Sequence, residues 1–275
     1  MSEPAVLEVA DLGVRIGGRT IVEQVSFAVQ REHTVGIVGE SGSGKSMTVL
    51  AATGLLDAPG ARVSGSSTLT GGSSPVQLVG AKPKVLRRVH GARIGFVFQD
   101  PGTSLNPLLT LERQITESLQ THRDMTRRAA TQRATELLEA VGLPDPATRL
   151  HAYPHQLSGG QKQRAMIAIA LACDPELLIA DEPTSALDVS VQARVLDLFA
   201  DLQEEFGFAA VFISHDLAVV ERVADRVVVL RGGRVVETGD ARTVLTVPTD
   251  PYTKALVDAV PYPDPVVQRR SRVTA

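Results

Sequence analysis

A glycine-rich stretch early in the chain has the residue types that bind phosphate. It fits the pattern G-x-x-x-x-G-K-[ST] and reads Gly39-Glu40-Ser41-Gly42-Ser43-Gly44-Lys45-Ser46. Glycines let successive backbone N–H groups curl around phosphate oxygens without Cβ clashes. Lys45 supplies a charge for the outer phosphates, the Ser46 hydroxyl can ligate Mg²⁺, and the next residue, Met47, completes the predicted binding set. The stretch predicts binding of a nucleoside triphosphate, without choosing among kinases, GTPases and motors.

Two adjacent carboxylates end a later apolar run. The run reads Leu177-Leu178-Ile179-Ala180-Asp181-Glu182. Asp181 is placed to help hold Mg²⁺, and Glu182 can polarise an attacking water. The alternative is a pair of solvated acids that cap a helix, because Pro183 and Thr184 open a turn. The phosphate-binding stretch upstream favours a reaction site.

A histidine follows another apolar run. The run reads Val211-Phe212-Ile213-Ser214 and is followed by His215. A lone histidine is usually a structural hydrogen-bonding group. Ligands of open parallel sheets, however, bind at the carboxyl ends of the strands. We therefore expect His215 to contact the γ-phosphate.

A third polar stretch precedes an apolar helical run. It includes Leu157-Ser158-Gly159-Gly160-Gln161. Ser158 can cap the helix, and Gly159 and Gly160 expose its first N–H groups. A flexible linker is the alternative, but the helix that follows at once argues against it. The stretch predicts a second anion site, without a lysine of its own for a triphosphate.

The elements that must position these residues alternate between short β-branched runs and amphipathic stretches. This pattern indicates a mostly parallel sheet covered by helices. We expect strands at 35–38, 94–98, 177–180, 210–214 and 226–230. Residues 62–86, rich in Gly, Ser and Thr, are expected to form antiparallel hairpins. A helical subdomain is expected at about 108–157, where apolar residues share one helix face: Ala130, Ala134, Leu137, Leu138 and Val141.

The composition excludes several function classes. A net charge of −3 argues against a broad nucleic-acid interface. The single cysteine, Cys173, excludes an internal disulfide and lies in an apolar run, so we expect a buried thiol. No apolar stretch approaches the ~18 residues that span a bilayer. The acidic N-terminal residues do not resemble a signal peptide. We expect a cytoplasmic chain that reaches a membrane only through partners.

From about Leu7 to Leu245, the motifs and their order resemble the nucleotide-binding subunit of ABC transporters. The resemblance implies an α/β P-loop NTPase (RecA-like) core with an antiparallel β subdomain and the helical insertion, within residues 1–250. It implies that Gln99 ligates Mg²⁺ and senses the channel, and that 185–188 cross a dimer interface. Two subunits would sandwich two ATPs, each facing Ser158–Gln161 of the other subunit.

Finer matches are similar to the oligopeptide, dipeptide and nickel importers. They are GESGSGKS at 39–46, FQDP at 98–101 followed by SLNP at 104–107, ADEPTSALDVSVQ at 180–192, and Pro251-Tyr252-Thr253. This branch implies import of peptides or a related small solute, at the cytoplasmic face of the membrane. Implied partners are two permeases, a second ATPase (a paralogue or a copy) and an extracytoplasmic binding protein. Import of a metal chelate such as nickel, and a repair or translation ATPase, are the alternatives.

Two features depart from this branch. Where Tyr-Gly-Gly is usual, with an aromatic ring to stack on adenine, the chain has Ile16-Gly17-Gly18. Val14 could occupy the stacking position instead. The cysteine-containing extension of many members is absent from the tail, 251–275. We expect residues from about Val266 onward to be dispensable for nucleotide hydrolysis.

Overall fold

A computed structural model describes residues 5–72, 74–185 and 187–259. Its larger sheet has six strands in the order β10-β9-β3-β8-β7-β6, and β10 is antiparallel to its neighbour β9. The strands are β3 (Thr34–Val38), β6 (Ile94–Val97), β7 (Leu177–Asp181), β8 (Ala209–Ser214), β9 (Arg226–Arg231) and β10 (Arg234–Asp240). All residues of β3 and β8 are buried, as expected for strands covered on both faces. The five expected strands are therefore confirmed.

The smaller sheet has the order β2-β1-β4-β5 and is antiparallel. Its strands are β1 (Ala5–Ile16), β2 (Arg19–Gln30), β4 (Ala61–Leu69) and β5 (Val76–Gln77). The antiparallel subdomain is thus confirmed, but residues 62–86 contribute only β4, β5 and the start of a helix. That helix is α2 (Pro83–Val89), with proline in its first turn. Proline is favoured there because N–H groups in the first turn of a helix have no helical acceptor, so the lack of an N–H costs no hydrogen bond.

Alternate side chains of the parallel strands contact two different cores. Leu177 and Ile179 pack in the cluster shared with β1, β2 and α1 (Lys45–Ala52). Leu178 and Ala180 pack in a second cluster with the helices on the other face. Because side chains of a strand alternate between faces, the sheet separates the antiparallel subdomain from the helical one.

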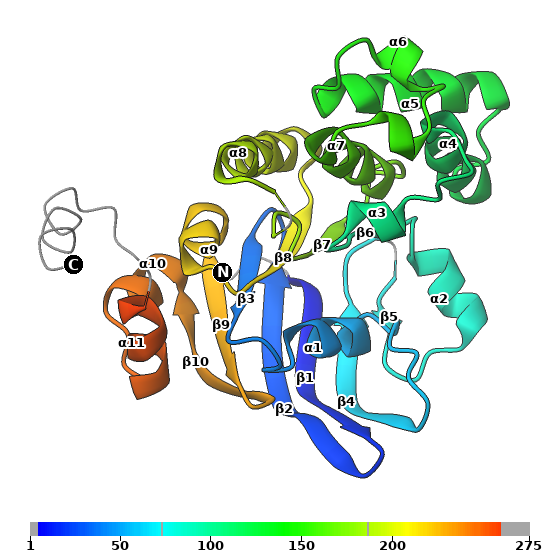
Figure 1. The fold of residues 1–275 in the computed structure, drawn as a ribbon. Coiled ribbons are helices and arrows are strands. Elements are labelled where there is room, and N and C mark those ends of the chain that lie inside the picture. The colour runs from blue at the N-terminus through cyan, green and yellow to red at the C-terminus, as the bar shows by residue number, and fades with distance from the viewer. Residues whose placement is uncertain (1–4, 73, 186, 260–275) are drawn as a thin grey trace, which may run out of the picture.

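The helical subdomain forms one end of the molecule (Figure 1). It contains α4 (Leu111–His122), α5 (Arg127–Ala140), α6 (Pro146–Arg149) and the 3₁₀ turn η1 (Pro154–Gln156). The five apolar residues predicted for one face of α5 and its C-cap are all fully buried. Cys173 is buried in the same cluster, and burial raises the pKa of its thiol, as expected of an unreactive core cysteine.

The remaining helices lie between the strands or, in the case of α10 and α11, follow the last strand, β10. They are α3 (Pro101–Ser104), α7 (Gly159–Ala170), α8 (Val189–Phe206), α9 (Leu217–Val223), α10 (Ala241–Thr246) and α11 (Pro251–Asp258). Part of the predicted tail is therefore a helix, which lies beside α10 (Figure 1). The rest of that tail, 260–275, and Ala186 of the predicted interface segment lie outside the described residues. Of the helices described, none has the length and apolarity to cross a membrane.

Candidate nucleotide site

The predicted phosphate loop connects β3 to α1, at the carboxyl end of a buried central strand. Gly39 has a φ of +150°, and a Cβ there would lie 2.1 Å from the carbonyl oxygen of Leu230. Gly44 caps α1 with a φ of +99°. Any residue other than glycine would be strained at both positions. The loop therefore requires these glycines, and it leaves the N-terminus of α1 open to an anion.

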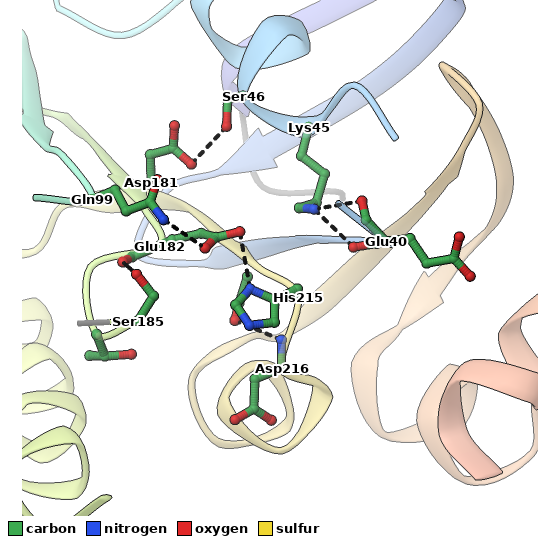
Figure 2. A network of polar contacts seen from close by, with 12 residues as sticks. Glu40, Lys45, Ser46, Gln99, Asp181, Glu182, Ser185, His215 and Asp216 are labelled. Atoms are coloured by element: carbon green, nitrogen blue, oxygen red, sulfur yellow. Dashed lines mark hydrogen bonds and ion pairs between the residues drawn. The ribbon is translucent and has the colours of Figure 1, made fainter. Parts of the chain in front are cut away.

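Lys45 lies inside this loop. Its Nζ donates to the carbonyl oxygens of Gly39 and Glu40 at 2.8 and 3.0 Å (Figure 2). Burial lowers the pKa of Lys45, while the nearby carboxylates of Glu182 and Asp181 raise it. The net effect is a lowered pKa, and the two carbonyl oxygens fix the Lys45 amino group where an incoming phosphate would need it.

Ser46 and Asp181 meet across the gap between α1 and β7. The Ser46 hydroxyl donates to Oδ1 of Asp181 at 3.0 Å. Burial raises the pKa of Asp181, the Ser46 hydrogen bond and Lys45 lower it, and Glu182 raises it further. A cation at this position would favour the ionised form of Asp181 and offset the cost of burying its negative charge. The pair is therefore suited to a hard divalent cation.

This cation site would be built from few protein ligands. In the described part of the chain, no group of three or more His, Cys, Asp or Glu side chains could hold a metal by itself. Mg²⁺ is usually held by one or two carboxylates together with phosphate oxygens and waters. The donors present, a hydroxyl, a carboxylate and the nearby amide of Gln99, fit that arrangement.

The carboxylate of Glu182 is held by a side chain at each oxygen. Oε1 lies 3.1 Å from Nδ1 of His215, and Oε2 accepts a hydrogen bond from Nε2 of Gln99 at 3.2 Å (Figure 2). Glu182 also has a φ of 45°, in the left-handed region that is unfavourable for most side chains. Its N–H donates to the carbonyl oxygen of Ile213 at 3.0 Å, and its own carbonyl accepts from the Ser185 hydroxyl. A strained residue fixed by so many contacts indicates a functional position.

Most of these residues line one cavity of about 590 Å³, whereas Asp181 lies behind it and contacts the lining residue Ser46. The sequence predicted all but one of the lining residues: Gly39, Glu40, Ser41, Gly42, Gly44, Lys45, Ser46, Met47, Gln99, Glu182 and His215. Ser43 is buried within the loop instead. The residue that the prediction missed is Leu256, from α11. The branch motif of α11, Pro251-Tyr252-Thr253, does not extend to Leu256.

The structure does not bring two predicted binding groups to this cavity. Ile16 is half-buried and packs against the core between the two sheets. Ser158 and Gly159 are exposed at the start of α7. There Ser158 Oγ accepts from the N–H of Gln161, and the Gln161 side chain accepts from the N–H of Ser158. This reciprocal capping fixes the helix start and satisfies the N–H groups of Ser158 and Gln161.

Comparison with known proteins identifies the family. The ABC transporter family matches residues 22–185. The chain is 46% identical to the dipeptide transport ATP-binding protein DppD of Escherichia coli (strain K12), over 94% of this chain and 79% of that protein. It is 48% identical to the peptidoglycan transport ATP-binding protein YejF of Agrobacterium fabrum (strain C58), over 94% of this chain and 48% of that protein.

A solved structure has the same fold. The ATP-binding cassette MJ0796, described as dimeric and in a post-hydrolysis state bound to ADP and Pi, superposes with a TM-score of 0.73 and 28% sequence identity. The superposition covers 86% of this chain and 99% of that chain. The P-loop NTPase fold is therefore confirmed. The chain belongs to the ABC transporter family and is an ATPase of that family.

Proposed function

We propose that the chain binds and hydrolyses ATP to power the uptake of peptides or a related small solute through two permease subunits. The observation that carries the proposal is the Glu182 carboxylate, held by Gln99 and His215 at the cavity of the phosphate loop. The names of the relatives, which specify dipeptide and peptidoglycan transport, support a peptide-containing cargo.

The chemistry follows from the positions of the side chains. Lys45 and the loop N–H groups bind the outer phosphates, and Ser46, Asp181 and Gln99 would hold Mg²⁺. The ion, when bound, neutralises charge that develops on the phosphates. Glu182 then orients and polarises the attacking water.

His215 has a defined place in this proposal. A carboxylate only accepts, so the 3.1 Å contact with Glu182 requires the proton on Nδ1 of His215. A hydrogen bond from Nε2 to the γ-phosphate requires a proton on that nitrogen as well, because phosphate oxygens only accept; both ring nitrogens are donors in the imidazolium. His215 thereby orients the base with one nitrogen and the phosphate with the other.

A second ATPase subunit completes the proposal. Ser158 and Gly159 are exposed, and the Ser158–Gln161 segment does not line the chain's own cavity. This placement supports contact with a nucleotide bound by a partner, whether a paralogue or another copy. The assembly would lie peripherally at the cytoplasmic face of the membrane, with an extracytoplasmic binding protein delivering the cargo.

An uptake assay tests the cargo. Cells that lack the gene should lose uptake of labelled dipeptide or oligopeptide, and the wild-type gene should restore it. The Glu182→Gln gene should not, although the protein is still produced. Loss of nickel uptake with normal peptide uptake would favour the metal-chelate alternative. Normal uptake of both would favour a role without a channel.

A further inference from the structure

Helix α11 is attached to the phosphate loop by one hydrogen bond. The N–H of Glu40 donates to the hydroxyl oxygen of Tyr252 at 3.0 Å. Tyr252 is 7% exposed, so water competes little for this contact. The carbonyl of the same residue, Glu40, accepts from Lys45 Nζ. A single peptide segment of the loop thus joins the tyrosine to the lysine that faces the phosphates.

Tyr252 is itself held from two sides. The guanidinium of Arg231, at the end of β9, lies 4.8 Å from the centroid of the tyrosine ring, a cation–π distance. On the helix side, Asp250 caps α11 and accepts from the N–H of Tyr252 at 2.8 Å. The hydroxyl therefore reaches the loop from a ring whose position is fixed.

The start of α11 is tied to β10 by a carboxylate clamp. Glu237 accepts from the N–H and the hydroxyl of Thr249 at 2.8 and 2.7 Å, and from the N–H of Asp250 at 3.1 Å. Burial by itself would raise the pKa of Glu237, but these hydrogen bonds, together with the side chain of Thr253, outweigh it and lower the pKa to about 2. The clamp is therefore ionised and intact at neutral pH.

The same face of α11 also reaches the cavity. Leu256 follows Tyr252 by four residues, so the two side chains lie on one side of the helix. Leu256 lines the nucleotide cavity. The helix thus contacts the site twice, once through the loop backbone and once through an apolar side chain.

We propose that Tyr252 is a positioning residue for nucleotide binding. Its hydroxyl fixes the backbone of the phosphate loop at Glu40, so that docking of α11 and binding of nucleotide stabilise each other. Because such coupling is reciprocal, loosening α11 weakens nucleotide binding, and bound nucleotide holds α11 in place. The proposal rests on the loop being the ATP site.

The Tyr252→Phe variant tests the hydroxyl. Phenylalanine keeps the ring and its contact with Arg231 and removes only the acceptor. We expect the Kd of the full-length subunit for ATP and for ADP to rise about three- to tenfold, the effect of one lost hydrogen bond. The maximal hydrolysis rate should change less than twofold, because the loop is used alike in ground and transition states. Tyr153→Phe, the same substitution at an exposed ring outside the cavity, is the control.

Hydrogen exchange followed by mass spectrometry supplies a structural readout. In Tyr252→Phe, peptides covering 39–46 should exchange faster without nucleotide, and in wild type saturating ATP should slow exchange in 251–258. Unchanged affinity in the variant would overturn the proposal, even with a lower Tm, since the hydroxyl would then only stabilise the fold. Absence of protection of 251–258 by ATP in wild type would also overturn it. Failure of wild type to bind ATP would refute the site itself, a separate result.

Discussion

Nδ1 of His215 lies 3.1 Å from Oε1 of Glu182, so the residue that follows β8 holds the carboxylate that follows β7. The two strands are parallel neighbours, with Asp181 paired to Ile213. Parallel pairing in this register brings the two side chains to one edge of the sheet. Asp181 and Glu182 are therefore held by contacts with Ser46, His215 and Gln99, as expected of a site and unlike a pair of solvated helix-capping acids.

Replacing the proposed base isolates its role. Glu182→Gln keeps the size of the side chain but removes the basic oxygen, so turnover should fall by about 10²- to 10⁴-fold while ATP binding is retained. The variant should accumulate as an ATP-bound dimer, because closure is kept and hydrolysis is lost. Steady-state hydrolysis and size-exclusion chromatography with ATP measure both effects. Near-normal hydrolysis would contradict the assignment.

The exposed start of α7 is tested by complementation between two inactive variants. Ser158→Arg should leave nucleotide binding by the isolated subunit unchanged and abolish hydrolysis in the assembly. Lys45→Ala should abolish binding in its own site. In a mixture of the two, recovery of part of the activity would show that copies pair, because one composite site is intact. No recovery would indicate that the partner is a paralogue.

The clamp at Glu237 predicts a specific pH dependence of stability. The pKa of this carboxyl is lowered from 4.5 to about 2 on folding. A depressed carboxyl pKa stabilises the fold above the unfolded-state value and loses that contribution as pH falls through the folded-state value. Urea unfolding should therefore show wild type more stable than Glu237→Gln from about pH 5 to 7. The difference should vanish as pH approaches 2. A constant difference across this range would exclude the clamp as its source.

Much of this site is predictable because its signals are local. The loop 39–46, the acids after β7 and the capping pair Ser158 and Gln161 each depend on a few consecutive residues. The contact between Glu40 and Tyr252 joins residues 212 positions apart in the sequence, and no local sequence pattern specifies a contact over such a separation. The left-handed conformation of Glu182 is set by its neighbours in space and was likewise not predicted. Helix α2 is different, because Pro83 at its start was a local signal that could have revealed it.

Ile16 ends β1, where it pairs with Arg19 in the hairpin to β2. An aromatic ring at this position could add up to ~1–3 kcal/mol by stacking on adenine, the range for bases on aromatic side chains. Isoleucine offers only apolar contact, and here it packs toward the core between the sheets. The phosphate contacts of Lys45, Ser46 and the loop should then dominate affinity. We therefore expect modest ATP affinity and weak discrimination between ATP and GTP.

The Ile16→Tyr variant tests this expectation. The tyrosine should tighten nucleotide binding several-fold without a comparable rise in the maximal hydrolysis rate, because stacking is equal in ground and transition states. Calorimetric titration of both proteins with ATP and GTP measures the effect, and Val14→Tyr tests the other position that could stack on the base. Val14 is fully buried, so a ring there would have to displace core side chains, whereas half-buried Ile16 has room toward solvent. A hundredfold preference of wild type for ATP, or no change with tyrosine at position 16, would mean that other residues hold the adenine.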